Sequence, residues 1–546
     1  MEPDSTADAG LAALTTPGPW QGLLDPRAAA RLGPALARWL AGRRWFGGKA
    51  RVVRGVAIRD AVAVPMGERE ARLALLRVDY EEGRPDLYAL PLAFASGPRA
   101  EAARASGAAL AALEAAGERG VLHAADGEPA FARALLDAVA RGRSFPGGEG
   151  ELVAWPTSAF AARARGAAAL EPAPLAGEQS NTSIRFGDRL VLKLFRRTEP
   201  GPNPDLEIGA FLTEEARFPH VPPLLGGIEY RPRRGEAIAV AVLHAFVPNQ
   251  GDAWAFTLRA VADALGRLGD PGPEPGPPSA LLARAAAPPP PAALALLGPY
   301  AAAAALLGRR TAELHAALAS ARDRPAFAPE PFSDEDRAAL AAAARSRVRA
   351  ACALLAERRG SLADGARALA DAVLAREAEL DARVRAAAAR PLRALRTRTH
   401  GDYHLGQVLW TGRDFVIIDF EGEPARPLAE RRAKASPLRD VAGMLRSFHY
   451  AAHQGLAGSA AGDPAAAARA GEGARAWCRW ASAAFLRGWL EGSRGAAFVP
   501  PPEELEALLD LFLLEKAAYE VAYELNHRPA WVALPLQGLL ERPDAA

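Results

Sequence analysis

The chain has 546 residues, which suggests about two to four domains. Half of the residues are hydrophobic and 7% are aromatic, so packed cores are expected and wholesale disorder is excluded. The 66 Lys and Arg nearly balance the 64 Asp and Glu, for a net charge of +2. This balance argues against a dedicated nucleic-acid-binding protein, which would carry a clustered basic excess.

The two cysteines, Cys352 and Cys478, are too few for a disulfide framework and indicate a reducing compartment. The N-terminal residues MEPDSTADAG lack the basic and apolar segments of a secretory signal. The most apolar run, residues 292–307, is interrupted by Gly298-Pro299 and falls short of a membrane span. We therefore expect a cytoplasmic protein that acts away from membranes.

Extended segments dominate the first hundred residues. ARLALLRVDY (71–80) and LYALPLAF (87–94) flank the turn EEGRPD and predict a β-hairpin in a small β-rich module. The upstream string RRWFGGK (43–49) is interpreted as a turn with a packed aromatic, away from the chemistry. Residues 98–145 are rich in alanine and are predicted to be mostly helical.

A second group of strands follows Leu175. The polar loop GEQSNTS (177–183) leads into two short strands joined at Gly187-Asp188. The next segment, NPDLEIGAFLTE (203–214), predicts a helix that Asn203 caps, with Pro204 in its first turn. Residues 237–247 predict a buried strand.

The second half of the chain is predicted to be helical from residue 254 to about 390 and again over 502–529. Two proline-rich stretches, at 270–278 and 288–291, are interpreted as loop insertions. One hairpin interrupts the helices: VLW (408–410) and FVIID (415–419) predict two strands about the turn Thr-Gly-Arg-Asp, which explains Asp414 as a turn residue.

A lysine lies in the middle of an apolar strand. Lys193, within LVLKLF, is costly to bury unless it contacts a ligand or an acid. Glu207, in the first turns of the following helix, is placed to be its partner. The alternative is an edge-strand lysine that extends to solvent, and Lys193 alone does not decide between them.

The hairpin region carries the remaining groups that phosphoryl transfer needs. In THGDYHLGQVLW, Asp402 follows His400-Gly401 and Gln407 follows five residues later; Asp419 ends the second strand. Mg²⁺ takes oxygen ligands from one or two side chains, which Gln407 and Asp419 supply. Asp402 is then left to accept the proton of an acceptor hydroxyl.

These motifs resemble the aminoglycoside-phosphotransferase-like kinases and, more narrowly, the bacterial maltokinases. The resemblance covers about residues 40–540 and depends on a set of strings: RRWFGGKAR, EQSNTSIRFGDRLVLKLFRRTEPGPNPDLEIGAFLTE, AFVPNQGDAW, LGRRTAELHAAL, THGDYHLGQVLW, IDFEGEPARPLAERRAKASPLRDVAGMLRSFHYAA and LLEKAAYEVAYELNHRPAWVALPL. Gln407 replaces the asparagine of the wider superfamily but agrees with the maltokinases. The loop over the phosphates has no glycine after Gly177, which leaves the preferred nucleotide open.

The resemblance implies an α+β, bilobal protein-kinase-like fold. It predicts an N-terminal cap over residues 1–110, a kinase N-lobe over 111–247 and a helical C-lobe over 248–546. The implied reaction uses ATP and Mg²⁺ to phosphorylate maltose at its anomeric hydroxyl, giving α-maltose 1-phosphate for α-glucan (glycogen) synthesis. It also raises association with a separate trehalose-isomerising enzyme.

The resemblance assigns a role to each matching position. Asp402 is the catalytic base, and Gln407 and Asp419 bind Mg²⁺. The acceptor sugar contacts Asp402, His404 and one face of the last long helix, formed by Lys516, Tyr519 and Tyr523. The nucleotide-binding positions are Gln179, Ser180, Asn181, Lys193, Glu207, His244, Phe246 and Val247.

Several alternatives stay open at this point. The related acceptors glucosamine and glucose would use the same phosphoryl-transfer groups, and a pseudokinase would lack Lys193, Asp402 or Asp419, which are all present. His404 and His315 also suit structural hydrogen bonding. Tyr519 and Tyr523 could be core aromatics at helical spacing. The charged run 425–440 is interpreted as a solvated loop and helix start, in which Arg439-Asp440 could support the Asp402 loop.

Overall fold

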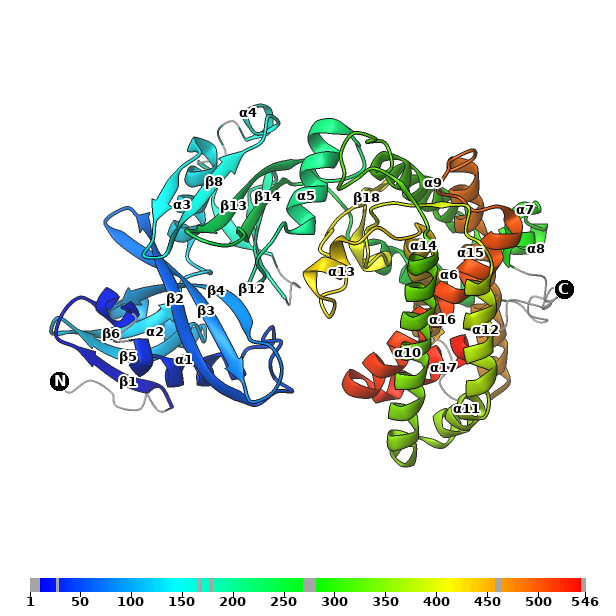
Figure 1. Cartoon of the computed structure of the whole chain (residues 1–546), viewed down its shortest axis with the longest axis horizontal. Coiled ribbons are helices and arrows are strands. Elements are labelled where there is room, and N and C mark those ends of the chain that lie inside the picture. The colour runs from blue at the N-terminus through cyan, green and yellow to red at the C-terminus, as the bar shows by residue number, and fades with distance from the viewer. Residues whose placement is uncertain are drawn as a thin grey trace. The chain divides into compact units, whose positions relative to one another are not determined.

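The computed structural model describes residues 10–25, 29–164, 166, 169–175, 180–268, 281–456 and 464–541. The chain divides into two compact units, Met1–Pro248 and Asn249–Ala546 (Figure 1). The first unit is built mainly from strands and the second mainly from helices.

Two seven-stranded sheets form the first unit. The first sheet has the order β1-β5-β6-β4-β3-β2, with β12 paired to β4, and the second has the order β7-β8-β13-β14-β11-β10-β9. Their strands are β1 (Ala12–Thr16), β2 (Val53–Met66), β3 (Arg69–Tyr80), β4 (Asp86–Ala95), β5 (Ala109–Ala115), β6 (Glu118–Ala124), β7 (Ser144–Pro146), β8 (Gly150–Pro156), β9 (Pro172–Pro174), β10 (Thr182–Phe186), β11 (Leu190–Leu194), β12 (Arg197–Thr198), β13 (Leu224–Pro232) and β14 (Ile238–Ala245).

The first sheet confirms the predicted hairpin, which forms β3 and β4. The prediction that residues 98–145 are mostly helical is wrong in part, because β5 and β6 lie there between α2 (Gly97–Ala105) and α3 (Pro129–Arg141). Alanine disfavours strands on its own, but β5 is paired on both sides, with β1 and β6, and is buried there. The predicted boundary at residue 110 falls inside β5.

The second sheet contains the predicted hairpin as β10 and β11, and the predicted buried strand as β14. One hydrophobic core joins both sheets through α3, whose Phe131 and Leu135 are fully buried. Residues of alternating burial on β10 explain why Ile184 and Phe186 enter this core while Ser183 does not. The other helices of this unit are α1 (Gly33–Ala41), α4 (Phe160–Arg163) and α5 (Pro204–Ala210).

The second unit is helical, as predicted, apart from two short two-stranded antiparallel sheets. The strands are β15 (Glu330–Pro331), β16 (Leu395–Arg396), β17 (Val408–Trp410) and β18 (Phe415–Ile417). The helices are α6 (Ala253–Gly266), α7 (Leu281–Ala286), α8 (Pro291–Leu297), α9 (Tyr300–Leu318), α10 (Asp334–Arg358), α11 (Asp364–Ala375), α12 (Glu377–Ala389), α13 (Leu428–Arg432), α14 (Leu438–Leu456), α15 (Pro464–Gly492), α16 (Pro502–His527) and α17 (Ala533–Leu540).

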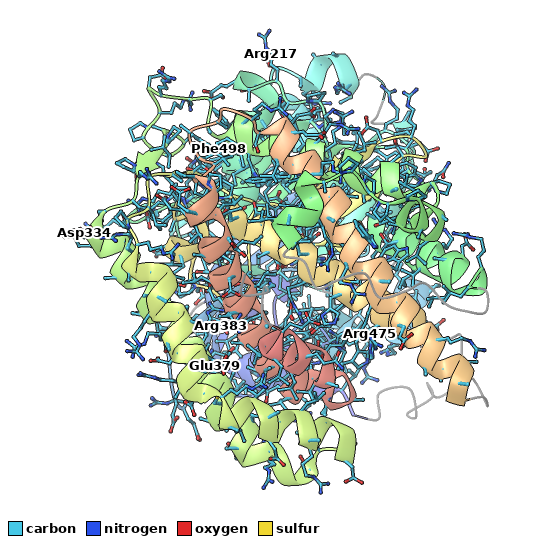
Figure 2. The ribbon with its side chains drawn as sticks, turned by 90° about the vertical axis from the view of Figure 1, so that its right-hand side faces the viewer. Arg217, Asp334, Glu379, Arg383, Arg475 and Phe498 are labelled. Atoms are coloured by element: carbon cyan, nitrogen blue, oxygen red, sulfur yellow. The ribbon has the colours of Figure 1, made fainter. Side chains whose placement is uncertain are left out.

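Small residues let α9 and α15 pack at very short range. A Cβ added at Gly308 would lie 2.0 Å from the Phe485 carbonyl oxygen, and one added at Gly488 would lie 2.0 Å from that of Ala305. Arg383 of α12, labelled in Figure 2, pairs with Asp510 of α16 at 2.7 Å. These contacts fix α15 against α9 and α16 against α12. Helix α16 also carries residues of the candidate site.

Within the part of the chain that the structure describes, no single helix is both long and apolar enough to cross a membrane. Helices α8 and α9 meet the length and composition criteria only as a pair, and they are bent by 87° at their junction.

Candidate active site

In the first unit, Lys193 lies on β11 with 12% of its side chain exposed. Its Nζ is 3.2 Å from Oδ2 of Asp205, an almost fully buried residue of α5. Asn203 caps this helix as predicted, since its Oδ1 accepts hydrogen bonds from the backbone N–H groups of Asp205 and Leu206. The sequence analysis missed Asp205. Glu207 lies two residues further along α5, and its pairing with Lys193 stays a prediction.

The predicted nucleotide-binding segments also belong to this unit. Ser180 and Asn181 precede β10, and Asn181 is buried, whereas Gln179 lies outside the described residues. His244 is near the end of β14, where its Nδ1 lies 3.3 Å from the Pro222 carbonyl oxygen. Phe246 and Val247 lie between the end of β14 and Pro248, the last residue of the first unit. The Phe246 N–H donates to the Arg189 carbonyl at 2.7 Å. Their contact with adenine stays a prediction.

In the second unit, a buried aspartate holds the backbone before Asp402. Asp440 of α14 accepts hydrogen bonds from the N–H groups of His400 and Gly401 at 2.8 and 2.9 Å. Its Oδ2 also lies 3.1 Å from Nε2 of His315. Burial raises the pKa of the Asp440 carboxyl, but the hydrogen bond from His315 and the neighbouring histidines outweigh this and leave the pKa below its usual value. This geometry supports the expected role of Asp440 in supporting the loop.

His315 is a structural residue, in agreement with the structural hydrogen bonding that the sequence analysis considered for it. It is fully buried, and Trp489 donates its indole N–H to Nδ1 at 3.0 Å. Because Nδ1 accepts, Nε2 carries the proton and donates it to Asp440. The imidazole thus fixes the carboxylate that in turn fixes the loop.

The structure brings Asp402 and Lys516 together, although they are far apart in sequence. Lys516 Nζ, on α16, lies 3.5 Å from Oδ1 of Asp402 and 2.9 Å from Oε1 of Glu423. Burial disfavours the ammonium, but the negative charges of Glu423 and then Asp402 outweigh this and raise the pKa of Lys516 above its ordinary value. Lys516 is therefore a fixed positive charge beside the predicted base.

Glu423, which the sequence analysis missed, is the centre of an ion-pair cluster. Its carboxylate contacts Lys516, Arg426 and Arg439, the last at 3.3 Å. Burial raises the pKa of Glu423, but the three cations outweigh it and hold the pKa well below its usual range. Arg426 also pairs with Glu515 of α16 at 3.1 Å. The prediction that the run 425–440 is solvated is thus wrong for two of its four arginines, Arg426 and Arg439, because each pairs with a buried carboxylate.

These groups line one pocket of the second unit. Its floor is the Asp402 loop and its walls come from α10, α14 and α16 and from the segment after β18. The lining residues are Arg347, Gly401, Asp402, Tyr403, Glu423, Arg426, Arg439, Asp440, Gly443, Phe512, Glu515 and Lys516.

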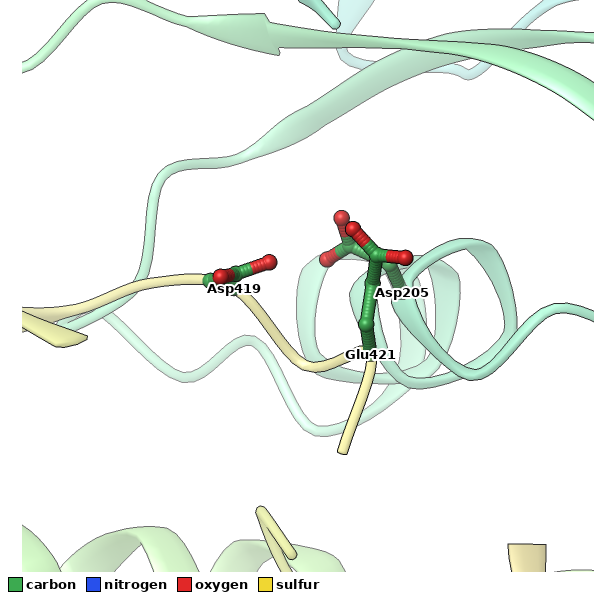
Figure 3. Close-up of side chains that lie close together, drawn as sticks. All are labelled: Asp205, Asp419 and Glu421. Carbon is green, nitrogen blue, oxygen red and sulfur yellow. The ribbon is translucent and has the colours of Figure 1, made fainter. Parts of the chain in front are cut away.

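The hairpin β17–β18 brings the two predicted metal ligands together. The Gln407 side-chain amide donates to Oδ2 of Asp419 at 2.9 Å, which leaves the Gln407 carbonyl oxygen for another partner. Asp419 has a backbone φ of +68°, an uncommon value outside glycine that turns the chain directly after the strand. A carboxylate oxygen of Glu421, two residues on, lies within 4.8 Å of one of Asp419 (Figure 3). Hard oxygen donors of this kind fit Mg²⁺. Figure 3 also shows Asp205 in the first turn of α5.

His404 has a local structural role, since its Nδ1 accepts a hydrogen bond from the Gly406 N–H at 3.1 Å. Burial lowers its pKa, against a weaker opposing effect of Asp402, so the imidazole is neutral near pH 7. A contact with substrate stays a prediction.

The two tyrosines of α16 are not core residues. Tyr519 is half-buried, and Lys516 Nζ lies 4.9 Å from the centre of its ring. Tyr523 is 42% exposed, and its ring is stacked with that of Tyr519 at 6.4 Å. The two rings continue the face of α16 on which Lys516 lies. The expectation of a shared face is confirmed, and the core alternative is excluded for Tyr523.

The missed residues share a reason. Asp205, Glu423 and Glu515 pair with cations 12, 93 and 168 residues away or with several cations at once, and sequence spacing does not reveal such contacts. The signal that the sequence did contain for Glu423 is its place four residues after Asp419.

Comparison with known proteins is consistent with these observations. Residues 39–128 match the model of the maltokinase N-terminal cap domain. A glucosamine kinase of Mycolicibacterium smegmatis is 29% identical over 365 residues, which cover 66% of this chain and 77% of that protein. A glucosamine kinase of Streptacidiphilus jiangxiensis is 30% identical over 234 residues, 42% of this chain and 47% of that one.

The fold has a close counterpart among solved structures. A glucosamine kinase in complex with glucosamine, ADP and inorganic phosphate superposes with a TM-score of 0.59 at 21% identity, covering 96% of this chain and 99% of that one. The fold is therefore that of a kinase, mixed α+β with an N-terminal cap. Within that class, the chain is similar to these two glucosamine kinases, and its residues 39–128 match the maltokinase N-terminal cap domain.

Proposed function

We propose that the chain transfers the γ-phosphate of ATP to the anomeric hydroxyl of maltose, giving α-maltose 1-phosphate for glycogen-type α-glucan synthesis. The observation that carries the proposal is the position of Asp402, held by a buried loop, next to Lys516 and the exposed tyrosine face of α16. The maltokinase cap domain supports maltose, and the relatives support a sugar.

Asp402 acts as the base in this reaction. As the sugar oxygen bonds to the γ-phosphorus and the bond to the ADP oxygen breaks, the hydroxyl proton passes to the Asp402 carboxylate. Lys516, at 3.5 Å, pairs with this carboxylate and orients it, while Asp440 fixes the backbone on the preceding side. Such positioning contributes more to phosphoryl transfer than covalent chemistry does.

Gln407, Asp419 and Glu421 would hold Mg²⁺ through oxygen atoms. When bound, the ion neutralises charge on the transferred phosphate. Lys193, fixed by Asp205, is a cation that suits the nucleotide phosphates.

The charge pattern of the pocket favours an uncharged acceptor. Glu423 already contacts three cations and Glu515 contacts two, Arg347 and Arg426. Asp440 is satisfied by His315 and two backbone N–H groups. An additional ammonium group, as in glucosamine, would have to compete with Lys516 for Asp402, whereas a neutral sugar would not.

Glucosamine is the second candidate, because both relatives bear that name. The deciding experiment is a sugar panel (maltose, glucose, glucosamine and trehalose) with ATP consumption measured and the site of phosphorylation located by ³¹P and ¹H NMR. We expect turnover with maltose and a phosphate on its anomeric oxygen. Preference for glucosamine would replace maltose as the acceptor, and absence of turnover with every sugar would refute a sugar kinase.

A further inference from the structure

A second, larger pocket lies within the first unit. Its volume is about 820 Å³, within the range of about 300–1,000 Å³ that is typical of ligand sites. The cap and the second sheet both contribute, through α1 and the turn after it, α2, α3, β9 and β10. Its charged and aromatic lining residues are Trp39, Arg43, Trp45, Arg69, Arg99, His123, Asp126, Glu128, Arg133 and Arg196.

Two of these arginines lie over tryptophan rings. The guanidinium carbon of Arg43 lies 4.2 Å from the centre of the Trp39 ring, and that of Arg196 lies 4.9 Å from the centre of the Trp45 ring. A stacked guanidinium is fixed in place and keeps its in-plane N–H groups for hydrogen bonds at its edge. The cap motif RRWFGGK, which the catalytic chemistry does not use, supplies Arg43 and Trp45.

Positive charge exceeds negative charge in this pocket. Among the described residues, five arginines line it against two carboxylates, Asp126 and Glu128. Glu128 is occupied by Arg69 at 2.8 Å and by His123 at 3.2 Å. Arg133 pairs with Glu171, an exposed residue that does not line the pocket.

Among the described lining residues, Asp126 is the carboxylate that interacts with both of these arginines. Arg196 lies 3.4 Å from Asp126, which also accepts a hydrogen bond from the Thr182 hydroxyl at 2.8 Å. The pKa of Arg43 is lowered by burial, which the attraction of Asp126 opposes and the repulsion of Arg196 reinforces. Both guanidinium groups therefore interact electrostatically with the same carboxylate, Asp126.

This pocket is distinct from the predicted nucleotide site. Ser183 of β10 pairs directly with Lys193 of β11, so their side chains share one face of the second sheet. Thr182 and Ile184 flank Ser183 and point to the opposite face. Both line the pocket, which therefore opens on the side of the sheet away from Lys193.

We propose that this pocket binds the phosphate group of a small phosphorylated metabolite between Arg43 and Arg196. Two fixed guanidinium groups match the oxygen atoms of a phosphate monoester. The volume leaves room for an organic part, next to apolar side chains such as Ala102, Ala173 and Ile184.

Isothermal titration calorimetry of the full chain tests this site, with inorganic phosphate as the minimal probe and glucose 6-phosphate as the organic one. A saturating non-hydrolysable ATP analogue with Mg²⁺ keeps the probes out of the nucleotide site. We expect both to bind, and we expect Arg43→Gln and Arg196→Gln each to weaken binding by about tenfold, the loss of one charge-assisted hydrogen bond. Asp126→Asn, which removes the competing negative charge but retains an acceptor for Thr182, should strengthen binding several-fold.

Arg119→Gln is the matched control, because it removes one positive charge from an exposed hairpin of the same unit, outside the pocket. Binding that is equal in Arg119→Gln, Arg43→Gln and Arg196→Gln would overturn the site. A weaker affinity of Asp126→Asn in a folded chain would also overturn the site. The expected increase in affinity cannot come from general damage to the fold. Stronger binding of inorganic phosphate than of glucose 6-phosphate would refute the organic ligand.

Discussion

The two described pockets are lined by the same types of charged side chain in different proportions. Around Asp402, three arginines and one lysine line the pocket together with four carboxylates, and Asp402, Glu423 and Glu515 each contact a cation. In the first unit, five arginines face two carboxylates. A matched set of charges orients groups without attracting an ion, whereas an unmatched set keeps a net field for an anion. The first pattern suits a neutral acceptor and the second suits a phosphorylated ligand.

The strongest test of the matched pocket is Asp402→Asn. Loss of the base should reduce kcat by about 10³-fold, within the range of general-base contributions, with the fold retained. Steady-state kinetics and the thermal midpoint provide the two measurements. Asp364→Asn, at an exposed position of the same unit, is the control that should leave both unchanged. Full activity of Asp402→Asn would remove the assignment of the base.

Glu423→Gln asks whether the matched charges stabilise the unit. Removing the carboxylate leaves Lys516, Arg426 and Arg439 without their common partner, so we expect a loss of about 3–5 kcal/mol in the free energy of unfolding. The control is Glu430→Gln, in the same segment but 56% exposed. Urea unfolding measures both, and equal effects would contradict a special role for Glu423.

The pH dependence of the same variant has a defined sign. The folded-state pKa of Glu423 lies below its ordinary value of 4.5, so its contribution is fully present above about pH 4.5 and is lost as the pH falls toward the folded-state pKa. The difference in stability between the wild-type chain and Glu423→Gln should therefore shrink as the pH falls below about 4.5. A constant difference from pH 7 to 4 and below would show that this carboxylate does not titrate as proposed.

Tyr519→Ala tests the sugar face of α16 and should have a smaller effect. Loss of one ring from the acceptor site should raise KM for the sugar by about three- to tenfold with little change in kcat, since the ring contacts the ground state and the transition state alike. Val52→Ala, at an exposed position in the first unit, serves as the control. A fall in kcat at constant KM would place Tyr519 in the chemistry instead.

The smallest expected effect sharpens the unmatched pocket. Arg99 is exposed on α2 and has neither a stacked ring nor an ion pair among the described residues, so it contributes charge without a fixed position. Arg99→Gln should weaken phosphate binding by only about two- to threefold, by the same calorimetric titration. An effect as large as that of Arg43→Gln would show that net charge, not the stacked geometry, determines binding.

Local patterns predicted much of this structure. The caps, turns and apolar runs around Asn203, Gly187 and Pro502 depend on neighbours in sequence, and the corresponding elements were found. The pairing of Gln407 with Asp419 was also predictable, because a single hairpin joins them. The resemblance to maltokinases supplied Lys516 and the tyrosines.

The remainder depended on contacts between distant segments. The alanine-rich β5 forms a strand because β1 and β6 flank it, which its own sequence does not favour. Arg426 appeared solvated because its second partner, Glu515, lies on α16, 89 residues away. Arg439 appeared solvated because Glu423 precedes it by 16 residues, a spacing that does not indicate a contact. The contact of Asp205 with Lys193 was not predicted, because it depends on how α5 packs near β11 and not on a local sequence pattern.

The buried Asp440 has a consequence for how the catalytic loop opens. The N–H groups of His400 and Gly401 donate to a carboxylate that α9 also holds, through His315 and then Trp489 of α15. Their exchange with solvent deuterium requires that helices from three parts of the second unit separate. We expect these two amides to exchange with the slowest amides of α14, so that the loop carrying the base does not fray on its own but opens only when the whole helical unit unfolds.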